Sequence, residues 1–251
     1  MPRRLPLVLI GLAALTPVAA VAALQQQADR PAGLITPARA AVHPAFDIVH
    51  TRISVRRNLA VFRMRVSGRA GARRPTRTGK LAGSRVFSYV WPTTLDPGVV
   101  GFEAGSGILA FAVTSHPDFD DTPLFDENGD GRLGNDGDLW HSHWVVLAPD
   151  AACGAGALKV VDIPGGATPR LPKTWPGLPI LIDSPGWSPT FRGRTVTVRV
   201  PFDDLSPVRA ARFDGVTAGL RVNESLHAPL LCVTNVFKTA SGDLSLPGTT
   251  D

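Results

Sequence analysis

An acidic stretch between residues 118 and 138, DFDDTPLFDENGDGRLGNDGD, carries side chains suited to binding a cation. Arg132 is its single basic residue, against the eight carboxylates of Asp118, Asp120, Asp121, Asp126, Glu127, Asp130, Asp136 and Asp138. So many like charges repel one another unless a positive charge lies among them. The composition therefore favours a bound Ca²⁺ ion, and a solvated turn without an ion is the alternative.

The register within this stretch matches the first half of a calcium-binding loop. Asp126, Asn128 and Asp130 alternate along the chain, so their oxygens converge as the backbone curls. Gly131 follows where such loops turn sharply, and the main-chain carbonyl of Arg132 falls at the backbone-ligand position. This half of the loop predicts an ion held by oxygen ligands.

The second half departs from the EF-hand pattern. Gly137 stands where an EF-hand has a bidentate Glu, and Pro123 and the apolar run 139–147 leave no room for a helix pair. We therefore predict an EF-hand-like loop without helices, set between strands, whose calcium is structural. Its predicted ligands are Asp126, Asn128, Asp130, Arg132, Asp136 and Asp138.

Histidines offer a second type of metal site. His141 and His143 lie two residues apart in the run LWHSHWVVL, and alternate residues of a β-strand point to the same side. His116 follows one predicted strand and His227 precedes another, so both join the pair if those strand ends meet. Such a group of imidazoles suits zinc or copper. The alternatives are buried structural histidines and histidines beside a small ligand.

Signatures of catalysis are sparse. The sequence contains no GxSxG nucleophile elbow, no phosphate-binding glycine loop and no HExxH run. A hydrolytic centre formed by His116 with Asp118, Asp120 and Asp121 ranks last among the functional hypotheses, because calcium binding accounts for the same carboxylates. We expect a binding or structural module rather than an enzyme.

The run Asp138-Leu139-Trp140-His141 after an acidic turn resembles exported β-sandwiches of the DOMON and family 9 carbohydrate-binding-module type. By strand pattern the resemblance covers residues 44–238. Some relatives hold haem b, commonly with a Met as axial ligand. Met64, the only methionine besides Met1, is the residue to which the resemblance gives that role, and an ordinary core position is the alternative.

Short apolar runs punctuated by 25 Gly and 23 Pro predict the fold class. Ala60, Phe62, Met64 and Val66 alternate with more polar neighbours, as in a half-buried strand. We predict a single-domain antiparallel β-sandwich, immunoglobulin- or DOMON-like or jelly-roll-like, over residues 44–245. Its predicted strands are 46–55, 60–66, 86–91, 108–114, 139–147, 158–163, 195–200, 216–222 and 230–237. The proline-rich residues 164–189 predict an ordered loop able to wall a pocket.

The N-terminal sequence predicts export. A basic start at Arg3 and Arg4, an apolar stretch over 5–21 and small residues near Ala22 read as a signal peptide over 1–23, followed by a linker over 24–43. No other segment approaches the roughly 20 apolar residues of a membrane-spanning helix. The mature protein is expected to be periplasmic or secreted, where Cys153 and Cys232 would form a disulfide.

Charge is distributed unevenly along the chain. Residues 24–80 hold 12 basic and 2 acidic residues, a net +10, whereas residues 81–251 hold 12 basic and 19 acidic residues, a net −7. Basic clusters suit an anionic envelope component or glycan, or simply a solvated surface. We expect no nucleic-acid partner. The leading hypothesis is an exported, calcium-stabilised module for an unidentified small molecule, glycan or envelope component, and the main alternative is a periplasmic protein that binds a transition metal or haem.

Overall fold

The computed structural model describes residues 32–225 and 228–251. Every pairing between its strands is antiparallel, which confirms the predicted all-β antiparallel class. Its helical elements are η1 (Pro97–Val100), η2 (Ala151–Cys153) and α2 (Ser206–Ala210). Its strands are β1 (Leu34–Ile35), β2 (Ile48–Arg56), β3 (Leu59–Val66), β4 (Arg85–Pro92), β5 (Ile108–Ser115), β6 (His141–Pro149), β7 (Leu158–Val160), β8 (Ile182–Asp183), β9 (Thr190–Arg192), β10 (Thr195–Pro201), β11 (Arg212–Phe213), β12 (Val216–Val222), β13 (Leu231–Thr239) and β14 (Gly248–Thr249).

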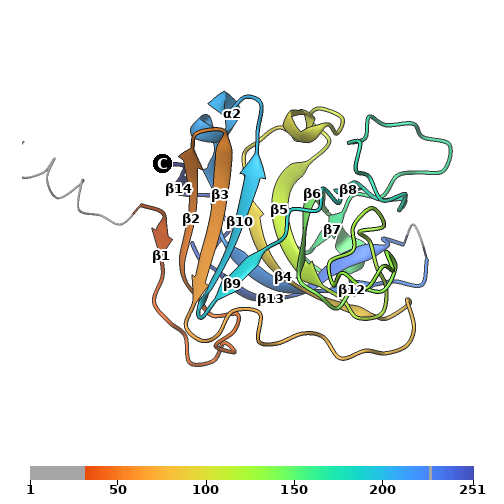
Figure 1. Ribbon diagram of the computed structural model, residues 1–251, viewed down its shortest axis with the longest axis horizontal. Helices are drawn as coiled ribbons and strands as arrows, with labels where there is room; N and C mark the ends of the chain where they lie inside the picture. Colours follow the sequence, from red (N-terminus) through yellow and green to blue (C-terminus); the bar gives the residue numbers. More distant parts are fainter. Residues whose placement is uncertain (1–31, 226–227) are drawn as a thin grey trace, which may run out of the picture. The chain divides into compact units, whose positions relative to one another are not determined.

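Two sheets organise the domain, and one of them is closed. The open sheet has the order β1-β2-β3-β10-β9, and the second has the order β5-β4-β12-β13-β7-β6-β8. Strands β5 and β6 also pair, from Ile108 opposite Leu147 to Thr114 opposite His141. This pairing closes six strands into a barrel, with β8 attached to β6 (Figure 1). The predicted sandwich of two open sheets is therefore not confirmed, because β5 and β6 leave no free edge between them.

The larger core lies between the open sheet and the outer wall of the barrel. Phe62 of β3 contacts Trp91 of β4, Phe111 of β5 and Trp144 of β6, with ring centroids 5.7, 4.5 and 5.7 Å apart. Met64 is fully buried in the same core. The alternation predicted for residues 60–66 is confirmed, since Ala60, Phe62, Met64 and Val66 are all buried.

A smaller core occupies the inside of the barrel. Strand β5 turns Leu109, Phe111 and Val113 toward the open sheet, whereas Ala110 and Ala112 belong to the inner group. Strand β6 alternates in the same way, with Trp144 and Val146 outside and Val145 and Leu147 inside. The large aromatic side chains thus fill the space between the sheets. The buried inner positions hold alanine and branched aliphatic side chains without aromatic rings, which leaves room within the barrel.

The segment before β2 is part of the fold. Strand β1 pairs with β2, so the predicted linker over 24–43 contributes a strand, while residues 1–31, including the predicted signal peptide, lie outside the described residues. The buried ammonium of Lys238 on β13 donates to the carbonyl of Pro37 and to Asp47, each at 2.6 Å. Residues Gly33 to Asp251 form one compact unit.

A disulfide joins Cys153 to Cys232, as predicted. It lies where β7 and β13 meet, and these two strands share a single residue pair, Lys159 opposite Cys232. The covalent bond therefore reinforces the barrel where its hydrogen-bonded pairing is shortest. Within the described part of the chain, no helix has the length and apolar character needed to cross a membrane.

Candidate metal centre

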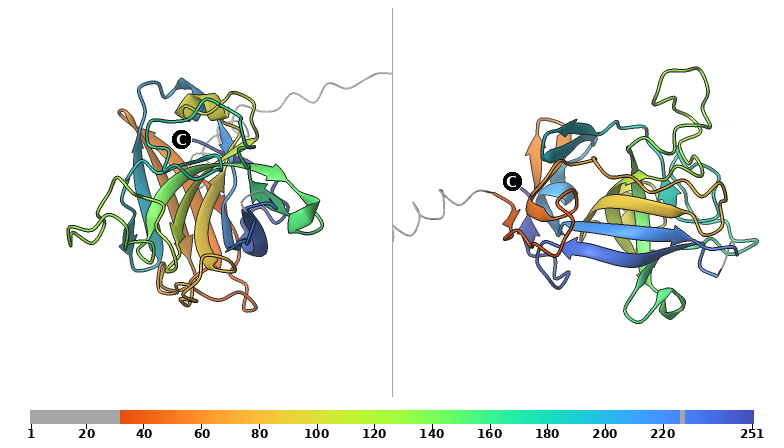
Figure 2. Two further views of the ribbon diagram at one scale, coloured as in Figure 1. Left: turned by 90° about the vertical axis from the view of Figure 1, so that its right-hand side faces the viewer. Right: turned by 90° about the horizontal axis from the view of Figure 1, so that it is seen from below.

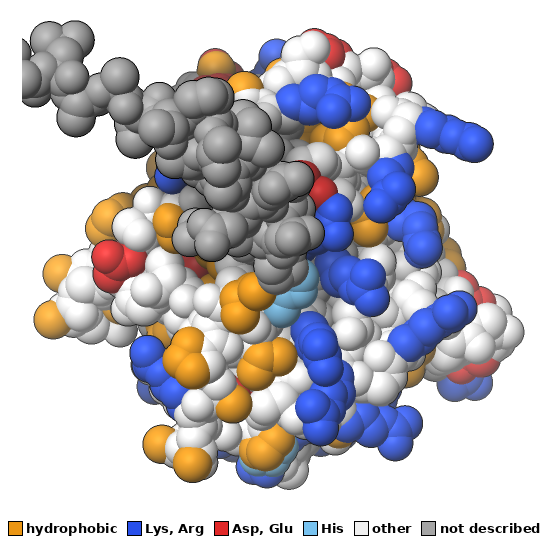
Figure 3. All heavy atoms as spheres, turned by 90° about the vertical axis from the view of Figure 1, so that its left-hand side faces the viewer, with side chains coloured by type: hydrophobic (Ala, Val, Ile, Leu, Met, Phe, Trp, Pro, Cys, Tyr) orange, Lys and Arg blue, Asp and Glu red, His pale blue; other side chains and the backbone are white. Residues whose placement is uncertain are grey.

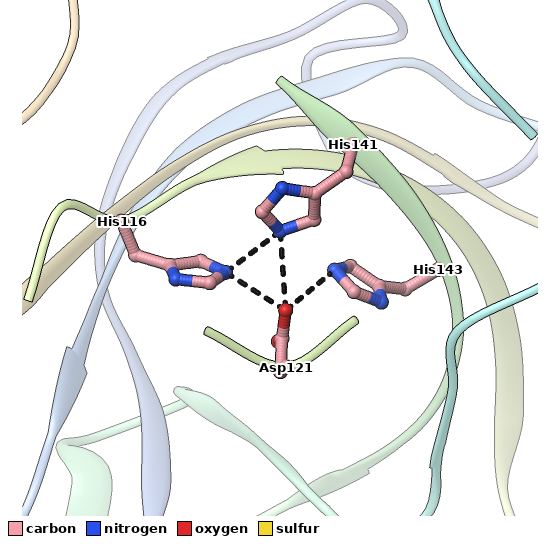
Figure 4. Close-up of side chains that lie close together, drawn as sticks. All are labelled: His116, Asp121, His141 and His143. Atoms are coloured by element: carbon pink, nitrogen blue, oxygen red, sulfur yellow. Dashed lines mark hydrogen bonds and ion pairs between the residues drawn. The ribbon is translucent and has the colours of Figure 1, made fainter. Parts of the chain in front are cut away.

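Four buried side chains converge at the barrel (Figure 4). His141 and His143 belong to β6, His116 follows the last residue of β5, and Asp121 lies in the loop that projects after it (Figure 2). One nitrogen of each imidazole and one oxygen of the carboxylate all lie within 4.8 Å of one another. Among the described residues, these four are the metal-ligating side chains (His, Cys, Asp or Glu) that lie close enough together to hold one ion.

The pairing of β5 with β6 brings the three histidines together. Ala112 lies opposite His143 and Thr114 opposite His141, so the chain leaving β5 carries His116 past the start of β6. The two β6 histidines are on the same face of the strand, and their ring centroids are 4.8 Å apart. The strand end before His116 thus meets the His141-x-His143 strand, which is the condition on which His116 was expected to join the pair.

Asp121 lies at the centre of the imidazoles. Its Oδ1 is 3.1 Å from Nε2 of His116, 3.1 Å from Nε2 of His141 and 3.3 Å from Nε2 of His143. Despite these short distances, Oδ1 of Asp121 and Nε2 of His143 have no partner with hydrogen-bond geometry. These two atoms face the space between the rings, whereas Nε2 of His141 forms a hydrogen bond with Nε2 of His116 at 2.8 Å.

In two of the histidines, a hydrogen-bond partner determines which ring nitrogen carries the proton and which one can bind a metal. Nδ1 of His116 lies 2.9 Å from the carbonyl oxygen of Phe119, which only accepts, so Nδ1 carries the proton. The hydroxyl of Ser184 donates to the carbonyl of Asp121 at 2.6 Å, and it therefore accepts from Nδ1 of His143 at 3.1 Å. In the neutral form of both rings, Nε2 therefore has the lone pair and faces the cluster, as second-shell partners arrange in metal sites.

Burial and mutual interaction set the charges of the cluster. Burial lowers the pKa of His141 to about 4, so this imidazole is neutral at neutral pH. Burial opposes ionisation of Asp121, but the surrounding histidines outweigh it and hold its pKa well below the ordinary value. Burial also acts against protonation of His116, yet the charge of Asp121 prevails and raises the His116 pKa. The site thus combines a carboxylate with nitrogen ligands, a donor set for a divalent ion.

The dimensions of the cluster suit a transition-metal ion. Ligands at about 2.0 to 2.1 Å from a tetrahedral zinc ion are about 3.3 Å apart. Here the separations from Asp121 are 3.1 to 3.3 Å, and Nε2 of His116 and His141 are 2.8 Å apart. Small outward movements of the rings would admit an ion. The four side chains could therefore hold one metal ion.

A Ser-His-Asp series is also present, but its hydrogen bonds have the wrong direction for nucleophilic catalysis. The Ser184 hydroxyl gives its proton to the Asp121 carbonyl and accepts one from His143. A general base would have to accept the serine proton. Ser184 is also 1% exposed, so its role is to orient His143 and the chain at Asp121.

The three carboxylates of the predicted hydrolytic centre do not share one set of partners. Only Asp121 contacts His116, whereas Asp118 accepts hydrogen bonds from the backbone of Thr78 and Gly79. Asp120 accepts from the backbone and hydroxyl of Thr122.

The predicted calcium ligands serve as hydrogen-bond acceptors within their loop. The carboxylate of Asp126 accepts from the N–H groups of Gly129, Asp130 and Gly131, and that of Asp130 accepts from the N–H of Arg132. Asn128 accepts from the N–H of Asp130 at 2.7 Å. Calcium binding by this loop stays a prediction.

The base of the same loop is more buried. Asp136 is 1% exposed and accepts from the N–H of Glu127 at 2.9 Å, while Asp138 lies 3.9 Å from Arg74. Oδ1 of Asp136 and both carboxylate oxygens of Glu127 are buried without partners. Burial is the main cause that raises the Glu127 pKa.

Packing explains why Gly137 replaces the closing Glu of an EF-hand. Its carbonyl accepts from the N–H of His116 at 2.6 Å, and a Cβ on it would lie 1.7 Å from the carbonyl oxygen of Phe119. Only glycine fits against the turn that carries His116 and Asp121. The turn that carries His116 and Asp121 thus requires glycine at position 137.

Two other predicted residues have different outcomes. His227 lies outside the described residues. Met64 is in the core between the sheets, away from the barrel interior that the histidines face, so the structure does not bring it to them. The sequence analysis places Asp121 in an acidic set and does not predict that it joins the histidines, because seven similar carboxylates surround it in sequence.

No family model, no curated protein and no solved structure matches this chain. The resemblance to DOMON and family 9 carbohydrate-binding modules therefore stays an expectation.

Proposed function

We propose that the protein binds one divalent transition-metal ion, zinc or copper, through His116, Asp121, His141 and His143. The observation that carries the proposal is the convergence of four buried ligand atoms within 4.8 Å. A buried carboxylate and imidazoles with unpaired atoms destabilise a fold unless something satisfies them. One metal ion would accept a lone pair from each of the four side chains at once.

Metal analysis of the purified protein tests this proposal. We expect about one zinc or copper ion per chain, and Asp121→Asn and His143→Ala should lower the affinity by at least tenfold. His43→Ala is the matched control, since His43 is an exposed histidine away from the cluster. A protein that takes up neither ion when titrated with each would refute the proposal, provided that circular dichroism shows it folded.

A calcium-stabilised loop is a second candidate function. It is favoured by the unpartnered buried oxygens of Glu127 and Asp136, which lie in the predicted loop. Adding Ca²⁺ to protein freed of metal ions should then raise the melting temperature, because binding to the native state alone stabilises by about 2.7 kcal/mol at a hundredfold excess over Kd. Asp136→Asn should abolish that response, whereas His143→Ala should leave it intact.

Export to the periplasm or the cell exterior is part of the proposal. It is supported by the N-terminal sequence pattern and by the disulfide, since disulfides persist in oxidising compartments. Fractionation of the producing cells, with N-terminal sequencing of the mature chain, tests it.

A further inference from the structure

An apolar cavity of about 320 Å³ lies inside the closed barrel and reaches the metal centre. Ala112, Val145, Val160 and Ala218 are among the side chains that line it, and all four belong to the inner core. A cavity of about 150 Å³ binds benzene in a well-studied engineered protein. By proportion, this one suits a molecule with about a dozen non-hydrogen atoms.

One part of the cavity wall is polar. His116, Asp121 and His143 line it, and so does Thr114, whose hydroxyl is buried without a hydrogen-bond partner. Exposed residues, among them Gly156, line another part, so the cavity opens to solvent there. An apolar ligand entering the barrel would thus find a hydrogen-bond donor and the metal centre at the same wall.

We infer that the barrel binds a small, mainly apolar molecule with one anionic oxygen group, such as a carboxylate, at the metal centre. The inference rests on the proposed function, because the anionic group would take a further coordination position on the ion. The charge of the four ligands supports it: a divalent cation bound to one carboxylate, Asp121, retains one positive charge, which one anionic ligand group would compensate. The hydroxyl of Thr114 would donate to the same group.

Calorimetric titration of decanoate, which has about a dozen non-hydrogen atoms, into the metal-loaded protein tests this inference. Ala218→Phe and Val160→Phe, which fill the cavity from different strands, should each weaken decanoate binding at least tenfold while metal uptake stays unchanged. Ala167→Phe is the matched control on an exposed loop and should bind decanoate as the original protein does. Decan-1-ol, which has the same chain without the charge, should bind at least tenfold more weakly than decanoate.

The outcomes separate this inference from the proposed function. Metal uptake without decanoate binding, or equal decanoate binding by both filled variants, overturns the cavity inference and leaves the metal proposal standing. Failure to take up metal refutes the metal proposal, and the filled variants then still decide whether decanoate enters the barrel. A cobalt-substituted protein whose visible spectrum is unchanged by decanoate overturns the placement of the carboxylate at the metal.

The outer face of the open sheet carries a separate feature. Arg52, Arg56, Arg63, Arg192 and Arg199 line a shallow hollow of about 390 Å³ whose lining includes no acidic residue. Figure 3 shows Lys and Arg side chains gathered over this side of the molecule. Arg52 and Arg63 are directly opposite on β2 and β3, and the guanidinium of Arg52 is paired with the carboxylate of Asp251.

Among the described residues, the other four arginines of this face form no ion pair, so we infer independently that the face binds an anionic polysaccharide. Guanidinium groups bind carboxylate and sulfate groups with paired hydrogen bonds. Ser54 and Thr197 add hydroxyl groups to the same lining. That lining includes no aromatic side chain on which nucleic-acid bases could stack, which favours a polysaccharide.

Binding of dextran sulfate, with neutral dextran as the control, tests the arginine face. The doubly substituted Arg63→Ser/Arg199→Ser protein should bind at least tenfold more weakly, and Arg85→Ser/Arg209→Ser, which removes exposed arginines elsewhere, should not. Binding should weaken as salt is raised. Equal loss in both double variants, or tighter binding of a single-stranded oligonucleotide than of dextran sulfate, would overturn the inference.

Discussion

At the scale of single residues, the proposed site depends on side chains that do not contact the ion. His116 and His143 each present Nε2 because Nδ1 is held by Phe119 and Ser184 respectively. The ring of His116 also stacks on that of Phe119, with centroids 4.0 Å apart. These contacts orient the rings before any metal arrives, which lowers the entropy cost of binding.

Replacing Ser184 with Ala should weaken metal binding by about 10- to 100-fold, the usual effect of losing a second-shell partner. The change frees the His143 ring to rotate and releases the carbonyl of Asp121. Ser142→Ala is the control, since the Ser142 hydroxyl donates to the carbonyl of Trp187 instead. Isothermal titration with zinc measures the difference, and equal affinities for the two variants would contradict the orienting role.

At the scale of elements, one turn and one seam hold the barrel and its site together. The turn that carries His116 and Asp121 packs against Gly137, so the long acidic loop returns to the barrel beside the histidines. The seam is the single residue pair between β7 and β13, beside which the disulfide lies.

Gly137→Ala should reduce both stability and metal affinity. The new methyl group would overlap the carbonyl of Phe119, so the turn must move and displace His116 and Asp121. Gly134→Ala, in the same loop, meets nothing within 4 Å and serves as the control. Thermal unfolding with and without zinc distinguishes them: zinc should raise the melting temperature of the Gly134 variant more than that of the Gly137 variant.

Removing the disulfide should loosen the barrel at its seam. The cysteines are 79 residues apart, and chain-entropy reasoning gives a stabilisation of about 4.5 kcal/mol for such a loop. We expect the Cys153→Ser/Cys232→Ser protein to unfold at lower urea concentration and to show faster amide exchange at β7 than at β3. Uniform acceleration of exchange in both strands would indicate that the disulfide does not act locally.

At the scale of the whole molecule, a buried ion pair ties the N-terminal segment to the barrel. Asp47 is 2% exposed and accepts from Lys238 Nζ at 2.6 Å and from the N–H of Arg39 at 3.1 Å. Burial acts to raise the Asp47 pKa, but Lys238 and the other donors outweigh it, so the pKa is lowered.

Acid should therefore weaken this connection. The unfolded carboxyl titrates at about pH 3.9, so the stabilisation is fully present above that pH and is lost as pH falls through the lower pKa of the folded state. Lys238→Met should cost about 3 to 5 kcal/mol near neutral pH, because Asp47 loses its buried cation. Urea unfolding from pH 7 to pH 3 should show the difference between the two proteins shrinking as Asp47 is protonated. A difference that stays constant would contradict the role of the pair.

The sequence by itself determined the local features of this protein. Alternation along residues 60–66 placed Phe62 and Met64 in a core, and the two-residue spacing of His141 and His143 put both imidazoles on one face of a strand. Such features need only the period of a β-strand, which neighbouring residues specify. The even number of cysteines likewise predicted the bond between Cys153 and Cys232.

Only the tertiary structure decided that one sheet closes and that Asp121 joins the histidines. Closure depends on the register in which Thr114 meets His141, and no local pattern encodes the pairing of strands separated by a long loop. The same loop contains eight carboxylates of similar local setting, and the close contact at Gly137 fixes the turn from which one of them reaches the imidazoles. The cavity follows from closure as well, since the small side chains of β5 enclose space only when β6 completes the barrel.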